Sequence, residues 1–401
     1  MKLADRLQGI APSATLEITA YANEMRASGI DVIGLAAGEP DFESPSQSKH
    51  DAIQAIEEGF TRYTATSGIA PLKTAIAEKL IHDNHLEYAN DAIIVSCGAK
   101  HSLFNLMQVL VNPGDEVLIP SPYWLTYPDQ VRLHGGVPVF IPTDEQTGFK
   151  TTAAQLTQFL TPRTKALVIN SPSNPTGAVY DQATLEAIAE LAVRHNLVVI
   201  SDEIYEHFVY DGRAHCSIAS LGEEIKARTM VINGVSKAFA MTGWRIGYAA
   251  GPKPLISAMG MIQSQSTSNP SSIAQKAAIG ALREGRDFYA PLVKEFTERR
   301  GIMHTQLTTI PGISCLKPDG AFYGFANVSA LIGARFSDQS MTSSSQIATY
   351  LLHEAHVAIV PGDPFGAPTH IRISYATSRE KIKTGLDRIR LAVQKLQTVT
   401  S

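Results

Sequence analysis

Seven short apolar segments, rich in β-branched residues, recur through the middle of the chain and narrow its choice of fold more than any other feature. They are AIIVSCG (92–98), DEVLIP (115–120), VPVFIP (137–142), KALVINSP (165–172), LVVISDE (197–203), TMVINGVS (229–236) and RIGYAAG (245–251). Helix-like stretches such as 99–110 and 182–195 lie between several of them. Near-continuous apolar strands that alternate with helices predict an α/β fold, with a mostly parallel sheet covered on both faces. The last segment follows too soon for a helical crossover, so we allow one antiparallel strand there.

The pattern changes after Pro270. A long helical stretch is expected at about 271–307, followed by Gly-punctuated strands, a helix near 344–355 and a terminal helix, which together indicate a smaller α+β domain. We therefore expect a large domain at 46–290, a small C-terminal domain at 291–401, and an N-terminal segment at 1–45 that packs with the small domain.

Composition excludes several functional classes. The net charge of −4, with no dense Lys/Arg stripe, argues against nucleic-acid binding. The N-terminus carries charges where a signal peptide would be apolar, and no window is long and apolar enough for a membrane span. The cysteines, Cys97, Cys216 and Cys315, are odd in number and lack the spacing of metal sites or disulfide frameworks. We expect a cytoplasmic protein without a bound metal.

Polar residues stand where the predicted strands end, and this is the edge at which open α/β sheets bind ligands. Four of the predicted strands are followed by such residues. Gly98, Ala99 and Lys100 come at the end of the first strand, Asn174 follows 165–172, Asp202 and Tyr205 lie at the end of 197–203, and Lys237 follows 229–236. Each taken alone is better explained as a turn, a tight packing position or a solvated charge. Their convergence at matching strand ends favours a site.

The stretch GVSKAFAMTGWRIGY (234–248) sharpens this prediction, because it holds two isolated cations, Lys237 and Arg245, in a small and apolar run. A phosphorylated aldehyde cofactor with a ring nitrogen would use such a set. A lysine binds the aldehyde covalently, a carboxylate such as Asp202 pairs with the protonated ring nitrogen, and a helix N-terminus at 98–100 with an arginine holds the phosphate.

The sequence resembles the class I and II aminotransferases, pyridoxal-phosphate enzymes of fold type I, and most closely the bacterial aspartate aminotransferases. The resemblance runs nearly end to end and rests on PSATL, AGEPDF (37–42), RYTATSGIAPLK (62–73), SPYW (121–124), NSPSNPTGAVY (170–180), SDEIYEHFVY (201–210), SKAFAMTGWRIGYAAGP (236–252), PDGAFY (318–323) and RISYATS (372–378). It implies pyridoxal 5'-phosphate as cofactor, with amino acids and 2-oxo acids as substrates.

The resemblance also assigns roles at the cofactor. Lys237 matches the lysine that binds the cofactor and shuttles the substrate proton, and Asp202 matches the carboxylate at the ring nitrogen. Asn174 and Tyr205 match the pair that hydrogen-bonds the phenolic oxygen, and Trp124 matches the aromatic residue that stacks on the ring.

The phosphate is expected to lie among Gly98, Ala99, Lys100, Ser236 and Arg245. Tyr63 matches the tyrosine that this family extends to the phosphate from the neighbouring subunit. The resemblance therefore implies a homodimer with shared active sites.

For the substrate, Arg372 in RISYA matches the arginine that grips the α-carboxylate, a task for which a bidentate guanidinium is suited. Gly38, Trp124 and Asn174 are expected beside it, and Gly38 matches a mobile glycine whose backbone meets that carboxylate. Lys100, Ser13 and Thr15 match positions near a distal carboxylate, which favours an acidic substrate. Some relatives that also use prephenate carry a lysine immediately before PSAT, where this chain has Ala11, and this argues against prephenate as a substrate.

We expect a ping-pong transaminase that moves the amino group of L-aspartate to 2-oxoglutarate and forms oxaloacetate and L-glutamate. The alternatives on the same fold are aromatic or broad-specificity amino donors, a C–S lyase, or a cyclopropane-forming synthase. A regulator's ligand-sensing module would need an attached DNA-binding region, for which the chain has no basic helix pair. A nicotinamide dehydrogenase would need a G-x-G-x-x-G turn, which is absent from the sequence.

Overall fold

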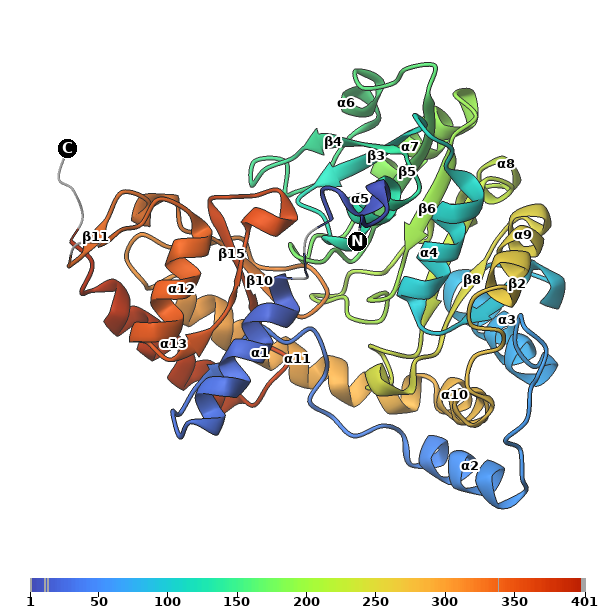
Figure 1. Cartoon of the computed structure of the whole chain (residues 1–401), viewed down its shortest axis with the longest axis horizontal. Helices are drawn as coiled ribbons and strands as arrows, with labels where there is room; N and C mark the ends of the chain where they lie inside the picture. Colours follow the sequence, from blue (N-terminus) through green and yellow to red (C-terminus); the bar gives the residue numbers. More distant parts are fainter. Residues whose placement is uncertain (1, 11, 13, 338, 398–401) are drawn as a thin grey trace.

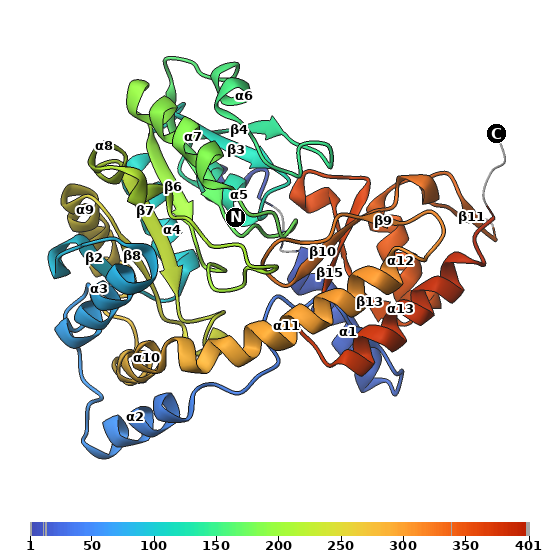
Figure 2. The ribbon, with the colours of Figure 1, turned by 180° about the vertical axis from the view of Figure 1, so that it is seen from behind.

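The fold is taken from a computed structural model, which describes residues 2–10, 12, 14–337 and 339–397, without the side chains of 14–16 and 339. Two bodies lie side by side, and the helix α11 runs along both of them (Figures 1 and 2). One body holds the central sheet and the other holds the C-terminal strands and helices. None of the helices among the described residues combines the length and the apolar character needed to cross a membrane.

The seven predicted apolar segments form one seven-stranded sheet with the order β2-β8-β7-β6-β5-β3-β4. Its strands are β2 (Ile93–Ser96), β3 (Glu116–Ser121), β4 (Val137–Pro142), β5 (Thr164–Asn170), β6 (Val198–Asp202), β7 (Thr229–Gly234) and β8 (Gly247–Ala250). Strands β4, β3, β5, β6 and β7 are mutually parallel, and β8 is antiparallel to both β7 and β2. This mixed α/β sheet confirms the predicted fold class, including the antiparallel strand.

Helices cover both faces of this sheet because its strands bury side chains on both sides. Strand residues such as Ile94 and Ile200 pack with α4 (Ala99–Leu110), α5 (Thr126–Leu133) and α9 (Lys253–Ser264). On the other face lie α2 (Ser46–Glu57), α3 (Ala70–Asn84), α6 (Ala153–Thr157), α7 (Gln182–Arg194), α8 (Glu223–Lys226) and α10 (Ser272–Glu284). The Asp181 side chain caps the N-terminus of α7, because it accepts a hydrogen bond from Thr184 N at 2.9 Å.

The long helix predicted over 271–307 is instead two helices, α10 and α11 (Arg286–Leu307), and this part of the prediction is wrong. The break falls at Gly285, whose φ of 51° lies in the left-handed region that glycine tolerates and other residues avoid. The sequence signal for it was a glycine inside the helical pattern. The expected domain boundary at 290/291 lies within α11.

The second body is built on an antiparallel sheet with the order β14-β15-β10-β9. These strands are β9 (Ser314–Cys315), β10 (Tyr323–Asn327), β14 (Val360–Pro361) and β15 (His370–Ser374), and they pack with α11, α12 (Ser344–Glu354) and α13 (Arg379–Val393). Two further short strands, β11 (Arg335–Phe336) and β12 (Gln339–Ser340), pair with each other in antiparallel orientation. From the N-terminal segment, β1 (Ile33–Gly34) pairs in parallel with β13 (Val357–Ala358), and α1 (Ala14–Ala27) lies against this body.

Candidate active site

A cavity of about 350 Å³ opens where the central strands end and the two bodies meet. Side chains from both bodies line it. The lining residues are Gly38, Ala99, Lys100, Trp124, Leu125, Tyr127, Asn170, Asn174, Asp202, Ile204, Tyr205, Ser236, Lys237, Arg245, Tyr323 and Arg372. Most of the residues predicted from the strand ends therefore share one cavity.

Lys237 lies at the end of the segment that leaves β7. Its Nζ donates a hydrogen bond of 2.6 Å to the backbone oxygen of Gly38. Burial lowers the pKa of Lys237 to about 8, although Glu39 acts in the opposite direction. An amine with this pKa is partly neutral near physiological pH, and a neutral amine is the form that attacks a carbonyl carbon.

Asp202 ends β6 and is almost wholly buried. Its carboxylate accepts hydrogen bonds from the Tyr127 hydroxyl at 2.7 Å and from the backbone N–H of Ile204 at 3.3 Å. Burial raises the pKa of Asp202 to about 6. Within the described residues no cation forms an ion pair with this carboxylate, so the site has a buried anion ready for a cationic group such as a protonated ring nitrogen.

An anion cradle lies between β2 and α4. Gly98 is the N-cap of α4, has φ 88° and leaves the helix N-terminus without a side-chain cap. A Cβ on Gly98 would lie 2.3 Å from Arg245 Nη2, so a larger residue here would displace this guanidinium from the start of the helix. Exposed backbone N–H groups and an arginine are the groups that bind a phosphate.

Arg372 reaches the cavity from β15 and is 2% exposed. Its Nη1 donates to Asn174 Oδ1 at 2.9 Å, and its Nη2 donates to the backbone oxygen of Ala36 at 2.8 Å. Its Nε is buried without a partner, and no carboxylate pairs with it among the residues described. A buried guanidinium held by neutral acceptors is suited to an anionic ligand.

The remaining predicted residues complete the walls. The hydroxyls of Tyr205 and Tyr323 lie 2.8 Å apart, and Asn174 N donates to Asn170 Oδ1 at 2.8 Å. Lys100 Nζ lies 5.0 Å from the centre of the Trp124 ring, which is within the range of a cation–π contact. Ser236 is buried beside Lys237.

Three predicted residues are not observed at the cavity. Tyr63 is 92% exposed and does not line the cavity. Ser13 lies outside the described residues, and for Thr15 only the backbone, in α1, is described. Their expected roles stay predictions.

Sequence reasoning missed three residues that hold the predicted ones in place: Tyr127, Asn170 and Tyr323. Tyr323 is the last residue of the quoted motif PDGAFY, and Tyr127 lies shortly after SPYW, so both could have been named as candidates from the sequence. Their partners Asp202 and Tyr205 are far away along the chain, and only the fold shows the contacts.

These groups are the ones that bind pyridoxal phosphate: an amine of lowered pKa, a buried carboxylate for the ring nitrogen, and a helix N-terminus with an arginine for the phosphate. The structure of an aspartate aminotransferase from Rhizobium meliloti aligns with 99% of this chain and 100% of its own, with a TM-score of 0.95 and 45% identity. Fold and site together define a pyridoxal-phosphate-dependent enzyme of fold type I.

Residues 30–389 match the family described as aminotransferase class I and II. An aspartate aminotransferase of Geobacillus stearothermophilus is 50% identical over 97% of this chain and 98% of its own. An aspartate/prephenate aminotransferase of Nitrosomonas europaea is 46% identical over 97% and 99%. The chain belongs to the class I and II aminotransferases, and the family predicted from its motifs is confirmed.

Proposed function

We propose that this enzyme transfers the amino group of L-aspartate to 2-oxoglutarate by a ping-pong mechanism, forming oxaloacetate and L-glutamate. The observation that carries the proposal is the buried guanidinium of Arg372, which faces the cavity with neutral partners only. Lys100 supplies a second cation at the cavity wall. The cavity is also lined by Lys237 and Arg245, which our proposal assigns to the cofactor, so Arg372 and Lys100 are the two cations left for the substrate, and they favour one with two carboxylates.

Arg372 binds the substrate α-carboxylate through its two outer nitrogens, with Asn174 holding the guanidinium in plane. The backbone of Gly38 lies beside the same carboxylate. Lys100 attracts the distal carboxylate, and Ser13 and Thr15 are predicted near it. Names of relatives that include aspartate support this assignment.

When bound, pyridoxal phosphate supplies an aldehyde that condenses with amino groups and a ring that takes up the electron pair of the substrate Cα. Lys237 Nζ would hold the cofactor covalently and would carry the proton of the substrate Cα. Asp202 would keep the ring nitrogen protonated, Tyr205 and Asn174 would orient the phenolic oxygen, and Trp124 would cover the ring.

The phosphate is held by Ser236, Arg245 and the backbone of residues 98–100, together with Tyr63 of a second subunit. The exposure of Tyr63 is compatible with this role, because its side chain is free to contact a partner subunit. Ile53 and Ile56 of α2 are also large apolar residues that are exposed. We therefore propose a homodimer with shared sites, acting in the cytoplasm, where its three free cysteines would stay reduced.

The test compares kcat/KM for L-aspartate and L-phenylalanine with 2-oxoglutarate as acceptor. The proposal predicts a clear preference for aspartate and parallel lines in double-reciprocal plots. A preference for phenylalanine would overturn the assignment of L-aspartate as the amino donor. The name of one relative includes prephenate, whereas Ala11 argues against prephenate as a substrate of this enzyme. An assay with prephenate as acceptor and L-glutamate as donor tests this wider specificity. Release of pyruvate and ammonia from cystathionine without an oxo acid would instead identify a C–S lyase.

A further inference from the structure

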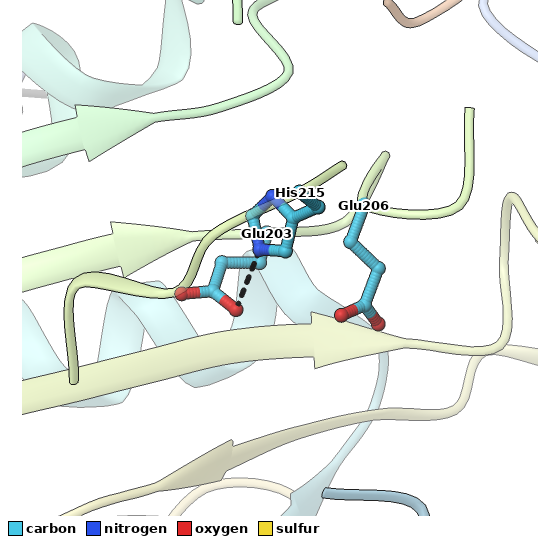
Figure 3. Close-up of side chains that lie close together, drawn as sticks. All are labelled: Glu203, Glu206 and His215. Atoms are coloured by element: carbon cyan, nitrogen blue, oxygen red, sulfur yellow. Dashed lines mark hydrogen bonds and ion pairs between the residues drawn. The ribbon is translucent and has the colours of Figure 1, made fainter. Parts of the chain in front are cut away.

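A cluster of buried polar side chains lies behind the cofactor site. Glu203 and Glu206 belong to the same turn as Asp202 and Tyr205, but they contact α3 and the loop around His215 rather than the cavity. They are 1% and 6% exposed. Figure 3 shows both carboxylates close to His215, whose Nε2 lies 3.1 Å from Glu203 Oε2.

The charge of Glu206 is balanced from α3. Lys79 Nζ forms an ion pair with Glu206 and also donates to Asn84 Oδ1 at 2.6 Å. Burial would raise the pKa of Glu206, but the Lys79 ammonium holds that pKa below its ordinary range. Burial lowers the pKa of His207 to about 3, so this neighbouring ring is neutral. Lys79 therefore supplies the cation that pairs with Glu206, and Glu206 remains an anion.

Asn233 connects this anion to the strand that leads to Lys237. Its Nδ2 donates to Glu206 Oε1 at 2.5 Å, and its Oδ1 accepts from the backbone N–H of Gly234 at 2.7 Å. The Asn233 side chain is therefore fixed at both ends, and it is 3% exposed. It stands on β7, four residues before Lys237.

This bond spans a place where the backbone ladder has ended. The pairing of β6 with β7 stops at Asp202 and Ile232, and Glu203 N donates once more to Ile232 O at 2.9 Å. Beyond this point the chain after β6 carries Tyr205, and the chain after β7 carries Lys237. A side-chain bond between Glu206 and Asn233 ties the turn after β6 to the last residues of β7, which at this point pair with β8 but no longer with β6.

We infer that the Asn233–Glu206 hydrogen bond is a positioning contact, which fixes the segment of Lys237 relative to the turn that carries Asp202 and Tyr205. A buried ion pair such as Lys79–Glu206 need not be present for stability, since apolar residues of similar volume often stabilise a core equally well. In this inference the pair serves to fix the geometry of the hydrogen-bonded side chains. The inference rests on the proposed roles of Lys237 and Asp202, but not on aspartate as the donor.

The test uses two matched asparagines. Asn233→Ala removes the link from Glu206 to β7. Asn84→Ala is the control, because Asn84 is equally buried and donates to Glu206 at 2.6 Å but belongs to α3. Three quantities are measured: the unfolding temperature of the apoprotein, the pH midpoint at which the visible band of the bound cofactor changes, and the affinity for pyridoxal phosphate. None of them needs an amino donor, so a failed donor assignment would leave this test intact.

We expect both variants to lower the unfolding temperature by similar amounts. Only Asn233→Ala should move the pH midpoint by more than about 0.5 unit and weaken retention of pyridoxal phosphate by about tenfold. Equal shifts in the two variants, or no shift in Asn233→Ala, would overturn the inference. If Asn233→Ala does not fold, Asn233→Ser takes its place with the same expectations.

A double variant separates the hydrogen bond from the charge. In Lys79→Met with Glu206→Gln both charges are gone, but the glutamine oxygen still accepts from Asn233. The pH midpoint should then stay within about 0.2 unit of the unsubstituted protein. A shift as large as that of Asn233→Ala would show that the charge of Glu206, and not the positioning bond, matters.

Discussion

At the scale of single residues, the site holds two buried charges of opposite sign, Asp202 and Arg372, each with neutral hydrogen-bond partners among the described residues. Burying a charge in this way is unfavourable for folding. We explain both buried charges by the ligand groups that they bind in our proposal, which are a protonated ring nitrogen at Asp202 and a carboxylate at Arg372. Stability lost in the empty protein is then regained on binding.

Asp202→Asn should make the apoprotein more stable while abolishing transamination. The folded-state pKa of about 6 lies above the ordinary 3.8, so the native protein binds this proton more tightly and loses stability as pH rises from 4 to 6. Asparagine keeps a hydrogen bond with Tyr127 and carries no charge. The gain should be below about 1 kcal/mol at pH 4 and about 3 kcal/mol above pH 7. Urea unfolding of both apoproteins across this range measures it, and a gain independent of pH would contradict the explanation.

Lys100→Ser should reduce the preference for aspartate. Losing the cation at the cavity wall removes an attraction that only a substrate with a distal carboxylate can use, so the ratio of kcat/KM for aspartate to that for phenylalanine should fall about tenfold. Lys276→Ser is the matched control, because Lys276 Nζ lies 4.8 Å from the Phe60 ring, a similar cation–π contact outside the cavity. An unchanged ratio in Lys100→Ser would remove Lys100 from substrate recognition.

At the scale of elements, the site depends on a close approach between β8 and the start of α4. A Cβ on Gly247 would lie 2.1 Å from the backbone nitrogen of Ala99, which faces the cofactor phosphate in our proposal. Gly247→Ala should therefore destabilise the fold by about 1–3 kcal/mol and weaken cofactor binding together.

The control for this prediction is Gly260→Ala in α9, where an added Cβ meets nothing within 4 Å. It should stabilise the protein by up to about 1 kcal/mol with unchanged cofactor affinity, because alanine favours a helix interior. Denaturant unfolding and titration with pyridoxal phosphate give both quantities. Wild-type cofactor affinity in Gly247→Ala would show that the approach of the two backbones is not needed.

The elements of the central sheet could be predicted because their apolar segments are long, regular and buried on both faces. Asp202, Asn174 and Lys237 could be placed at one edge for the same reason, since parallel strands bring their ends together. The break between α10 and α11 was missed because a glycine inside a helical pattern only weakens a helix, and the sequence does not show that Gly285 has a φ of 51°.

Side-chain contacts between distant elements were not predictable. The Tyr127 hydroxyl on Asp202, and the links from Lys79 and Asn233 to Glu206, join residues that no local pattern relates. The role of Tyr63 came from the motif resemblance alone, because in our proposal Tyr63 contacts the cofactor phosphate bound by the other subunit.

At the scale of the whole molecule, shared sites make a prediction about mixed subunits. Tyr63→Asp places a carboxylate against the phosphate and Lys237→Ala removes the essential amine, so each variant alone should be nearly inactive. Dissociated and mixed at equal amounts, they should regain about a quarter of wild-type activity, because half of the dimers are hybrids with one native site each. Copurification through a tag on one subunit controls for hybrid formation. Hybrids without activity would contradict sharing through Tyr63.

The measurement that tests the assignment most directly is a single half-reaction followed by absorbance. The holoenzyme is mixed with L-aspartate and no oxo acid, the released products are quantified, and 2-oxoglutarate is then added. We predict that the visible band disappears with release of oxaloacetate equivalent to the active sites, and that 2-oxoglutarate restores it with formation of L-glutamate. A band that responds to L-phenylalanine but not to L-aspartate, or a continuous release of ammonia without an oxo acid, would contradict aspartate transamination.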